Sequence, residues 1–158
     1  MSQRQRKKLS RRLFGAIQDG DTAVVKAVLR AGVDPERADN EGTTPLYAAS
    51  VQGEAVTAGL LLAAGASPDA ESSGIGAEGT PLCAAACWGH TETVRELLSH
   101  GADPNAREDH GTGWSPLDWA SNGPHPETAA LLIAAGARSS GEPLLAAPFD
   151  ARRRPVFG

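Results

Sequence analysis

Short apolar stripes recur along this chain and predict pairs of short helices. Residues 80–86 begin with Thr-Pro-Leu and continue with small apolar side chains. Threonine can cap a helix and proline fits its first turn, so a helix is expected to begin there. Gly89 interrupts the pattern, a second stripe runs through Val94 and Leu97, and Gly101 follows as the residue that best adopts a left-handed helix end. The stretch therefore predicts two helices, a turn between them and an extended loop after them.

This unit occurs three times with nearly constant spacing. The capping residues are Thr44, Thr80 and Ser115, and each is followed by proline and leucine. The closing glycines of the same copies are Gly65, Gly101 and Gly136. Each closing glycine lies 21 residues after its capping residue. The helix pair therefore has a fixed length, only the connecting loop varies, and a period of this kind is typical of solenoids.

The repeated motifs resemble the ankyrin repeat. T-P-L, G-H and G-A-D-P-N all occur in register, and the resemblance covers roughly residues 10–147. It implies an all-α solenoid of helix-turn-helix units with β-hairpin or loop fingers. The repeats are expected at about 10–38, 39–70, 75–106 and 110–138, followed by a truncated C-terminal capping helix at 142–147.

The two ends of the chain are interpreted separately from the repeats. Residues 1–9 are predicted to be a basic N-terminal tail, with Ser10 capping the first helix, although the basic segment could also extend that helix. Arg11 and Arg12 stand where later repeats have threonine and proline, which suits an end repeat that faces water. Residues 148–158 are predicted to be a C-terminal tail.

Composition restricts the compartment and the class of protein. Aromatic residues make up only 4% of the 158 residues, so small alanines and leucines are expected to do the packing. Two cysteines are too few for a disulfide framework and suit reduced thiols. The sequence shows no signal peptide behind its basic start and no apolar run long enough to cross a membrane. These features predict a cytoplasmic protein.

Charge is divided unevenly along the chain. Residues 4–12 contain six basic residues and no acid, and Arg152, Arg153 and Arg154 add three more near the end. Residues 13–151 contain all 19 acids and only six basic residues, a net charge of −13. Many of these acids fall in the predicted fingers, where they would attract a basic partner and speed its approach. They could equally form turns and keep the surface solvated.

The resemblance also implies which residues meet a partner. It places Asn40, Glu41, Thr43, Glu78, Thr112 and Trp114 on or beside the fingers, and Val51, Gln52, Cys87, Trp88 and Asn122 at the ends of the first helices. Tyr47, Cys83 and Asp118 share one repeat position at the rim of the concave face. Trp88 and Trp114 are the strongest candidates because tryptophan is enriched at binding hot spots, unless each packs on a neighbouring loop. Trp119 replaces an inward-facing apolar residue and is expected in the core.

Three patterns that resemble chemical sites are weak. Residues 74–79 match G-x-G-x-x-G, but a dinucleotide site needs a buried strand before the motif, and residues 68–73 are polar. Cys83, Cys87 and His90 could supply three zinc ligands, but no fourth is evident. Cys87 could act as a nucleophile with a histidine base, yet no residue that would orient the base can be named.

The sequence therefore favours a non-enzymatic protein-protein interaction module without a cofactor or a resident metal. It would bind a protein partner with a basic surface through its concave face and fingers, as an inhibitor or an adaptor. The alternatives are an enzyme accessory or metal-responsive protein that uses Cys83, Cys87 and His90, and a purely structural spacer. Nucleic acid is expected only at the basic N-terminal segment, because the acidic body would repel phosphates. The sequence leaves the oligomeric state open.

Overall fold

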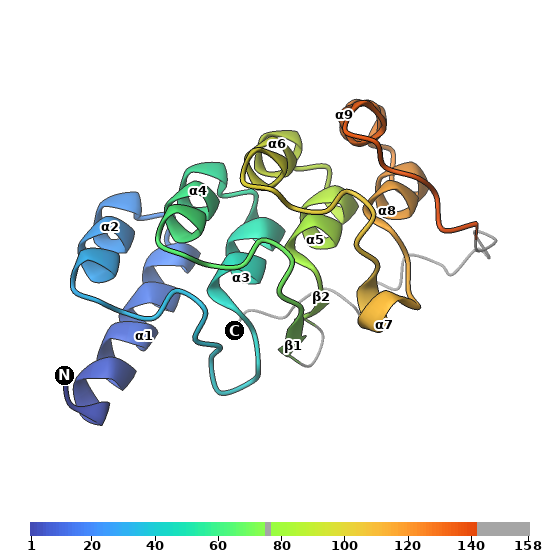
Figure 1. Cartoon of the computed structure of the whole chain (residues 1–158). Helices are drawn as coiled ribbons and strands as arrows, with labels where there is room; N and C mark the ends of the chain where they lie inside the picture. Colours follow the sequence, from blue (N-terminus) through green and yellow to red (C-terminus); the bar gives the residue numbers. More distant parts are fainter. Residues whose placement is uncertain (75–76, 142–158) are drawn as a thin grey trace.

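Paired helices stack in sequence order along the molecule. The computed structural model describes residues 1–74 and 77–141. The pairs are α1 (Gln3–Gln18) with α2 (Thr22–Arg30), α3 (Pro45–Gln52) with α4 (Ala55–Ala63), α5 (Pro81–Cys87) with α6 (Thr91–Ser99), and α8 (Pro116–Asn122) with α9 (Pro126–Ala134). Figure 1 shows α1, α3, α5 and α8 in one row and their partners in a second row. The predicted all-α solenoid is confirmed, whereas the predicted capping helix at 142–147 and the tail at 148–158 lie outside the described residues.

The inner helices begin where the sequence predicts. The side-chain hydroxyls of Thr44, Thr80 and Ser115 each accept a hydrogen bond from the backbone N–H three residues later, at 3.1–3.2 Å. Proline occupies the first helical position after each of them. Gly101 follows the end of α6 with φ +87°, a conformation that other residues adopt only with strain. Local chemistry therefore sets the length of each pair, as the constant spacing indicates.

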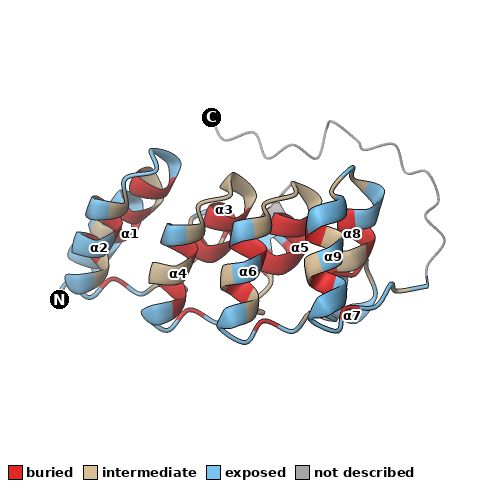
Figure 2. Cartoon of the chain, turned by 90° about the horizontal axis from the view of Figure 1, so that it is seen from above, coloured by how far each residue is buried: buried red, intermediate tan, exposed pale blue. Residues whose placement is uncertain are grey.

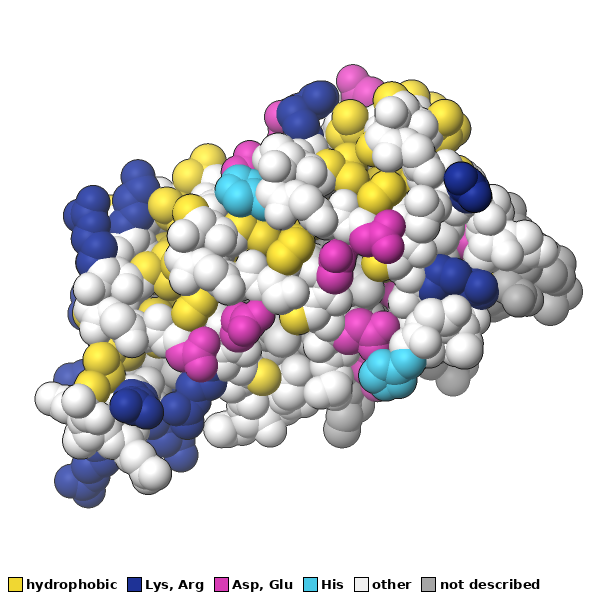
Figure 3. Space-filling view, viewed as in Figure 1, with side chains coloured by type: hydrophobic (Ala, Val, Ile, Leu, Met, Phe, Trp, Pro, Cys, Tyr) yellow, Lys and Arg dark blue, Asp and Glu magenta, His cyan; other side chains and the backbone are white. Residues whose placement is uncertain are grey.

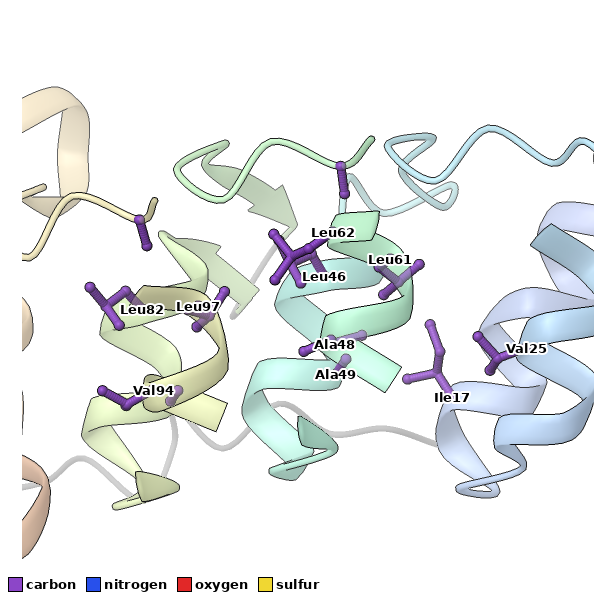
Figure 4. Close-up of a cluster of buried hydrophobic side chains, with 14 of the residues drawn as sticks. Ile17, Val25, Leu46, Ala48, Ala49, Leu61, Leu62, Leu82, Val94 and Leu97 are labelled. Carbon is purple, nitrogen blue, oxygen red and sulfur yellow. The ribbon is translucent and has the colours of Figure 1, made fainter. Parts of the chain in front are cut away.

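The core is one continuous layer between the two rows of helices. Figure 4 shows it running from Ile17 and Val25 through Leu61 to Leu82 and Leu97. All five side chains are fully buried. Buried positions face the space between the rows, while the outer surfaces of α2, α4, α6 and α9 are largely exposed (Figure 2). Each pair buries its apolar face against its neighbours, so the finger loops are carried by a rigid stack.

The first helix is longer than predicted. It begins at Gln3 rather than after Ser10, because Ser2 and Gln5 form a reciprocal capping box. Ser10 lies inside the helix with only 8% of its surface exposed. The assignment of residues 3–9 to a tail is therefore wrong, and the alternative of a longer helix is confirmed.

The loops between the pairs extend from one side of the stack, as the family resemblance implies (Figure 1). One of them forms an antiparallel hairpin of β1 (Ser72–Gly74) and β2 (Ala77–Gly79). The next contains the single turn α7 (Glu108–Gly111), in which Asp109 and His110 have φ of +50° and +54°. Aspartate and histidine are among the few residues that tolerate this left-handed conformation.

Candidate protein-binding face

The finger loops and the C-terminal ends of the inner helices are together called the finger face. It consists of residues 39–43, 70–74, 77–79 and 107–114 with the C-terminal ends of α3, α5 and α8, which lie at the far end of each helix from the finger that leads into it. Acidic side chains gather over these loops, and basic side chains gather at the N-terminal end of the stack (Figure 3). The acids in the loops include Asp39, Glu41, Glu71, Glu78, Glu108 and Asp109.

Most of the predicted partner-binding residues are accessible on this face. Asn40, Glu41, Glu78, Thr112 and Asn122 are exposed, and Gln52, Cys87, Trp88 and Trp114 are partly exposed. Gln52, Trp88 and Asn122 lie at or just beyond the ends of three successive inner helices. Gln52 and Trp88 occupy the same repeat position, and Asn122 occupies the position one residue earlier, equivalent to Cys87. The ends of successive inner helices therefore present different side chains.

Three predicted residues are buried instead. The backbone N–H of Thr43 donates to the side chain of Asp39, and the backbone oxygen of Thr43 accepts from the N–H of Asp39. Thr43 therefore closes the turn. The hydroxyl of Tyr47 donates to the backbone oxygen of Glu78 at 3.2 Å, which ties α3 to the hairpin. Asp118 is 2% exposed. Because their polar groups are used inside the chain, we exclude Thr43, Tyr47 and Asp118 from the proposed binding surface.

A pair of tryptophans meets a carboxylate at the C-terminal end of the finger face. The ring centroids of Trp114 and Trp119 are 4.7 Å apart with the planes tilted by 58°. The indole N–H of Trp119 donates to Oε2 of Glu108 at 2.9 Å. Trp119 was predicted to lie in the core. It packs against the core but remains partly exposed. Repeat periodicity identified the apolar position and gave no signal for its contact with Glu108, because that contact joins the helix α8 to the finger turn α7, 11 residues earlier.

Glu108 influences the polar groups around it. Burial raises the pKa of the Cys87 thiol to about 11, and the negative charge of Glu108 adds to that rise. Burial and Glu108 likewise raise the pKa of the Cys83 thiol well above its usual value. The same two causes, in the same order, raise the pKa of the Tyr47 hydroxyl. The two cysteines are free thiols, and neither is activated as a nucleophile.

Asp118 forms a junction rather than a recognition site. Its carboxylate accepts hydrogen bonds from the N–H and hydroxyl of Ser115, the hydroxyl of Ser139 and the N–H of Ser140. Burial by itself raises the pKa of this carboxyl, but the bonds from Ser139, Ser140 and Ser115 outweigh it and lower the pKa to about 2. The charged carboxylate therefore fastens the segment after Gly136 to the start of α8.

The hypothetical zinc ligands do not converge. His90 lies with Nε2 2.9 Å from the backbone oxygen of Val51 in the preceding repeat. His125 repeats this contact with the backbone oxygen of Cys87 at 3.1 Å. The thiol of Cys83 points to the backbone oxygens of Ala106 and Trp114 instead. Over residues 1–74 and 77–141 no group of three or more His, Cys, Asp or Glu side chains could hold a metal ion.

The glycine-rich motif at residues 74–79 is part of a finger. Its described residues belong to β1 and β2, which pair with each other in an antiparallel hairpin. A dinucleotide site would need a buried strand leading through the motif into a helix. The motif therefore follows from the hairpin and does not indicate a nucleotide.

The comparison with known families agrees with this architecture. A family model described as ankyrin repeats (3 copies) matches residues 58–141, which is more than half of the chain. The chain belongs to the ankyrin-repeat family. No curated protein matches it. None of the described helices is both long and apolar enough to pass through a bilayer.

Proposed function

We propose that this chain is a non-enzymatic binding module whose finger face recognises a protein with a basic surface. Ankyrin repeats are generally protein-protein interaction modules. The observation that supports a basic partner is the contact of Trp114, Trp119 and Glu108 within a row of acidic loops. A lysine or arginine side chain bound there would meet both an aromatic face and a carboxylate.

The fingers support this function because they are linked to one another before any partner arrives. The backbone N–H of Ser67 donates to Glu36, that of Asp103 to Asp69, that of His110 to Glu71 and that of Arg138 to Asn105, at 2.8–3.1 Å. Each bond joins the loops of successive repeats. A surface that is already ordered loses less conformational entropy on binding. The guanidinium of Arg107 adds rigidity by donating to the backbone oxygens of Thr112 and Gly113.

The acidic residues contribute mainly to the rate and specificity of recognition. Exposed charges such as Glu41 and Glu78 steer an approaching partner, whereas partly desolvated tryptophans supply contact area. The module would act as an inhibitor or an adaptor for that partner. Its free thiols suit the reducing cytoplasm, where we place it.

A pull-down with matched variants tests the proposal. The double variant Trp88→Ala with Trp114→Ala removes two partly exposed aromatic side chains from the finger face. Arg95→Ala with Glu127→Ala removes two exposed side chains from the outer helices and serves as the control. We expect a basic protein to be recovered by the wild type and the control but lost with the tryptophan variant. Equal recovery by all three proteins would show that the finger face is not the binding surface.

A further inference from the structure

The outer helix α4 differs from its counterparts in the other repeats. Counted back from the closing glycines, Lys26 of α2 and Arg95 of α6 occupy equivalent positions, where α4 has Gly59 and α9 has Ala130. The helix α9 still carries the exposed Glu127 in its first turn. From Ala55 to Ala66 the only polar side chain is Thr57, which is buried. The residues of α4 itself therefore add no charge and no exposed hydrogen-bonding side chain to its solvent side, unlike an ordinary solvated helix face. The neighbouring charge on the α6 side is the carboxylate of Glu96, which lies over Gly59.

The exposed apolar residues of α4 form a second stripe, opposite its buried face. Val56, Leu60, Ala63 and Ala64 have the i, i+4, i+7, i+8 spacing that places side chains along one face of a helix. Val56 is 62% exposed, which makes it one of the most exposed large apolar side chains among the described residues. Ala63 and Ala64 are also exposed, and Leu60 is partly so. Leu61, on the other face, is fully buried in the core.

A groove runs between this stripe and α2. It has a volume of about 330 Å³ and is lined by Leu29, Leu60, Ala63 and Ala64, with Lys26 and Arg30 at its α2 side. Both cations are exposed, and neither has an acidic partner in the described part of the chain. Figure 3 shows hydrophobic surface over the outer helices next to basic side chains at the N-terminal end. The floor of the groove is apolar and one of its walls is basic.

We propose that this groove binds an acidic amphipathic helix of a second protein partner. The apolar stripe of α4 extends over the length of a helix and suits the leucine ridge of another helix packed alongside it. Lys26 and Arg30 lie four residues apart on α2, so carboxylates with the same spacing on the incoming helix can pair with both. The groove differs from the finger face in position and in the sign of its charge, so the two surfaces can hold two partners.

A labelled synthetic peptide tests the fit to the intact chain. The probe is a peptide of about five helical turns with leucines at i, i+4, i+7 and i+11 and glutamates along one flank. We expect it to bind measurably in fluorescence anisotropy. The same peptide with lysines in place of the glutamates, or with a central proline that breaks the helix, should bind at least about tenfold more weakly. Equal binding by the lysine or proline peptide would overturn the acidic or the helical part of the proposal.

Variants of the chain locate the binding site. Ala63→Glu places a carboxylate in the groove and should weaken binding of the glutamate peptide by about tenfold or more. Ala134→Glu is the matched control, because Ala134 occupies the same repeat position on α9 and is also exposed. The pair Lys26→Glu with Arg30→Glu should lose the glutamate peptide and bind the lysine peptide instead. Equal effects of Ala63→Glu and Ala134→Glu, with both proteins folded by circular dichroism, would contradict the proposed site.

Sedimentation of the chain alone distinguishes a second copy from a different partner. A concentration-dependent dimer that Ala63→Glu abolishes and Ala134→Glu preserves would identify a second copy as the occupant and overturn the proposal. A monomer at all concentrations, together with binding of the glutamate peptide, supports it. Trp88→Ala with Trp114→Ala should leave peptide binding unchanged, which keeps this result independent of the finger-face proposal.

Discussion

The hydroxyl of Ser139 donates a 2.6 Å hydrogen bond to Oδ1 of Asp118, 21 residues earlier in the chain. Together with the N–H of Ser140, it joins the segment after α9 to the first turn of α8. The same carboxylate completes the capping box of Ser115. One buried charge therefore closes the C-terminal repeat.

Asp118 should make stability depend on pH in the acid range. Its folded pKa of about 2 lies below the usual value of 3.8, so its contribution is complete above about pH 4 and is lost as the pH falls towards 2. The contribution is on the order of 2 kcal/mol. Asp118→Asn should lower the free energy of unfolding by about that amount at pH 7, and the difference from wild type should shrink at pH 2.5. Urea denaturation at both pH values measures it.

Glu127→Gln is the matched control, since Glu127 is exposed in the first turn of α9. It should change the free energy of unfolding little at either pH. A constant difference between Asp118→Asn and wild type at both pH values would rule out the ionised carboxylate as the source of stability.

Gly53 should be more sensitive to substitution than Gly65. Both have positive φ, +73° and +104°, so alanine costs about 1 to 2 kcal/mol of backbone strain at either place. A Cβ at Gly53 would also come within 2.6 Å of Nδ1 of His90, whereas a Cβ at Gly65 meets nothing within 4 Å. Gly53→Ala should therefore destabilise the protein more than Gly65→Ala in thermal or urea unfolding.

A double-mutant cycle checks the cause of that difference. His90→Ala removes the ring and the contact of its Nε2 with the backbone oxygen of Val51, and should cost about 1 kcal/mol on its own. In combination with Gly53→Ala the two losses should be less than additive, because the clash disappears with the ring. Additive losses would mean that only the backbone conformation of Gly53 matters.

Cys87 should react slowly with alkylating reagents at neutral pH. With a pKa of about 11, roughly one thiol in a thousand is ionised at pH 8. The rate of iodoacetamide labelling, followed by mass spectrometry, should rise about tenfold for each pH unit up to pH 10. Glu108→Gln should speed labelling at pH 9, because it removes a charge that raises this pKa. Labelling at Cys87 that is fast and independent of pH would indicate an activated thiol and revive the nucleophile hypothesis.

Charge reversal on the fingers should slow association with the basic partner. Glu41→Lys with Glu78→Lys should reduce the association rate constant several-fold, on the order of 3- to 10-fold, at low salt and less at 0.5 M salt. Asp19→Lys with Glu127→Lys changes the net charge equally at exposed positions outside the finger face. Stopped-flow measurements compare the two variants. An equal reduction in both would assign the effect to net charge rather than to the finger face.

The sequence alone determined the repeat architecture, because each helix pair is specified by residues close together in the chain. The Thr-Pro-Leu caps and the closing glycines act within a few residues of themselves, so their spacing predicts both helices and their length. The predicted start of the first helix at Ser10 was wrong, because the sequence also offers a helix cap at Ser2. The capping box of Ser2 with Gln5 begins α1 at Gln3. The accessible candidates, the exposed Glu41 and the partly exposed Trp88 and Trp114, followed from repeat position in the same way.

The tertiary structure decided which of those side chains face solvent and which meet one another. Tertiary contacts join residues 11 to 39 positions apart, such as Trp119 with Glu108 within one repeat or His110 with Glu71 between repeats, and no local pattern encodes them. Burial of Tyr47 and Asp118, and the groove between α2 and α4, likewise depend on how one pair packs on the next. Helix caps act through neighbouring backbone groups and can be recognised in the sequence, whereas a surface exists only after the stack has formed.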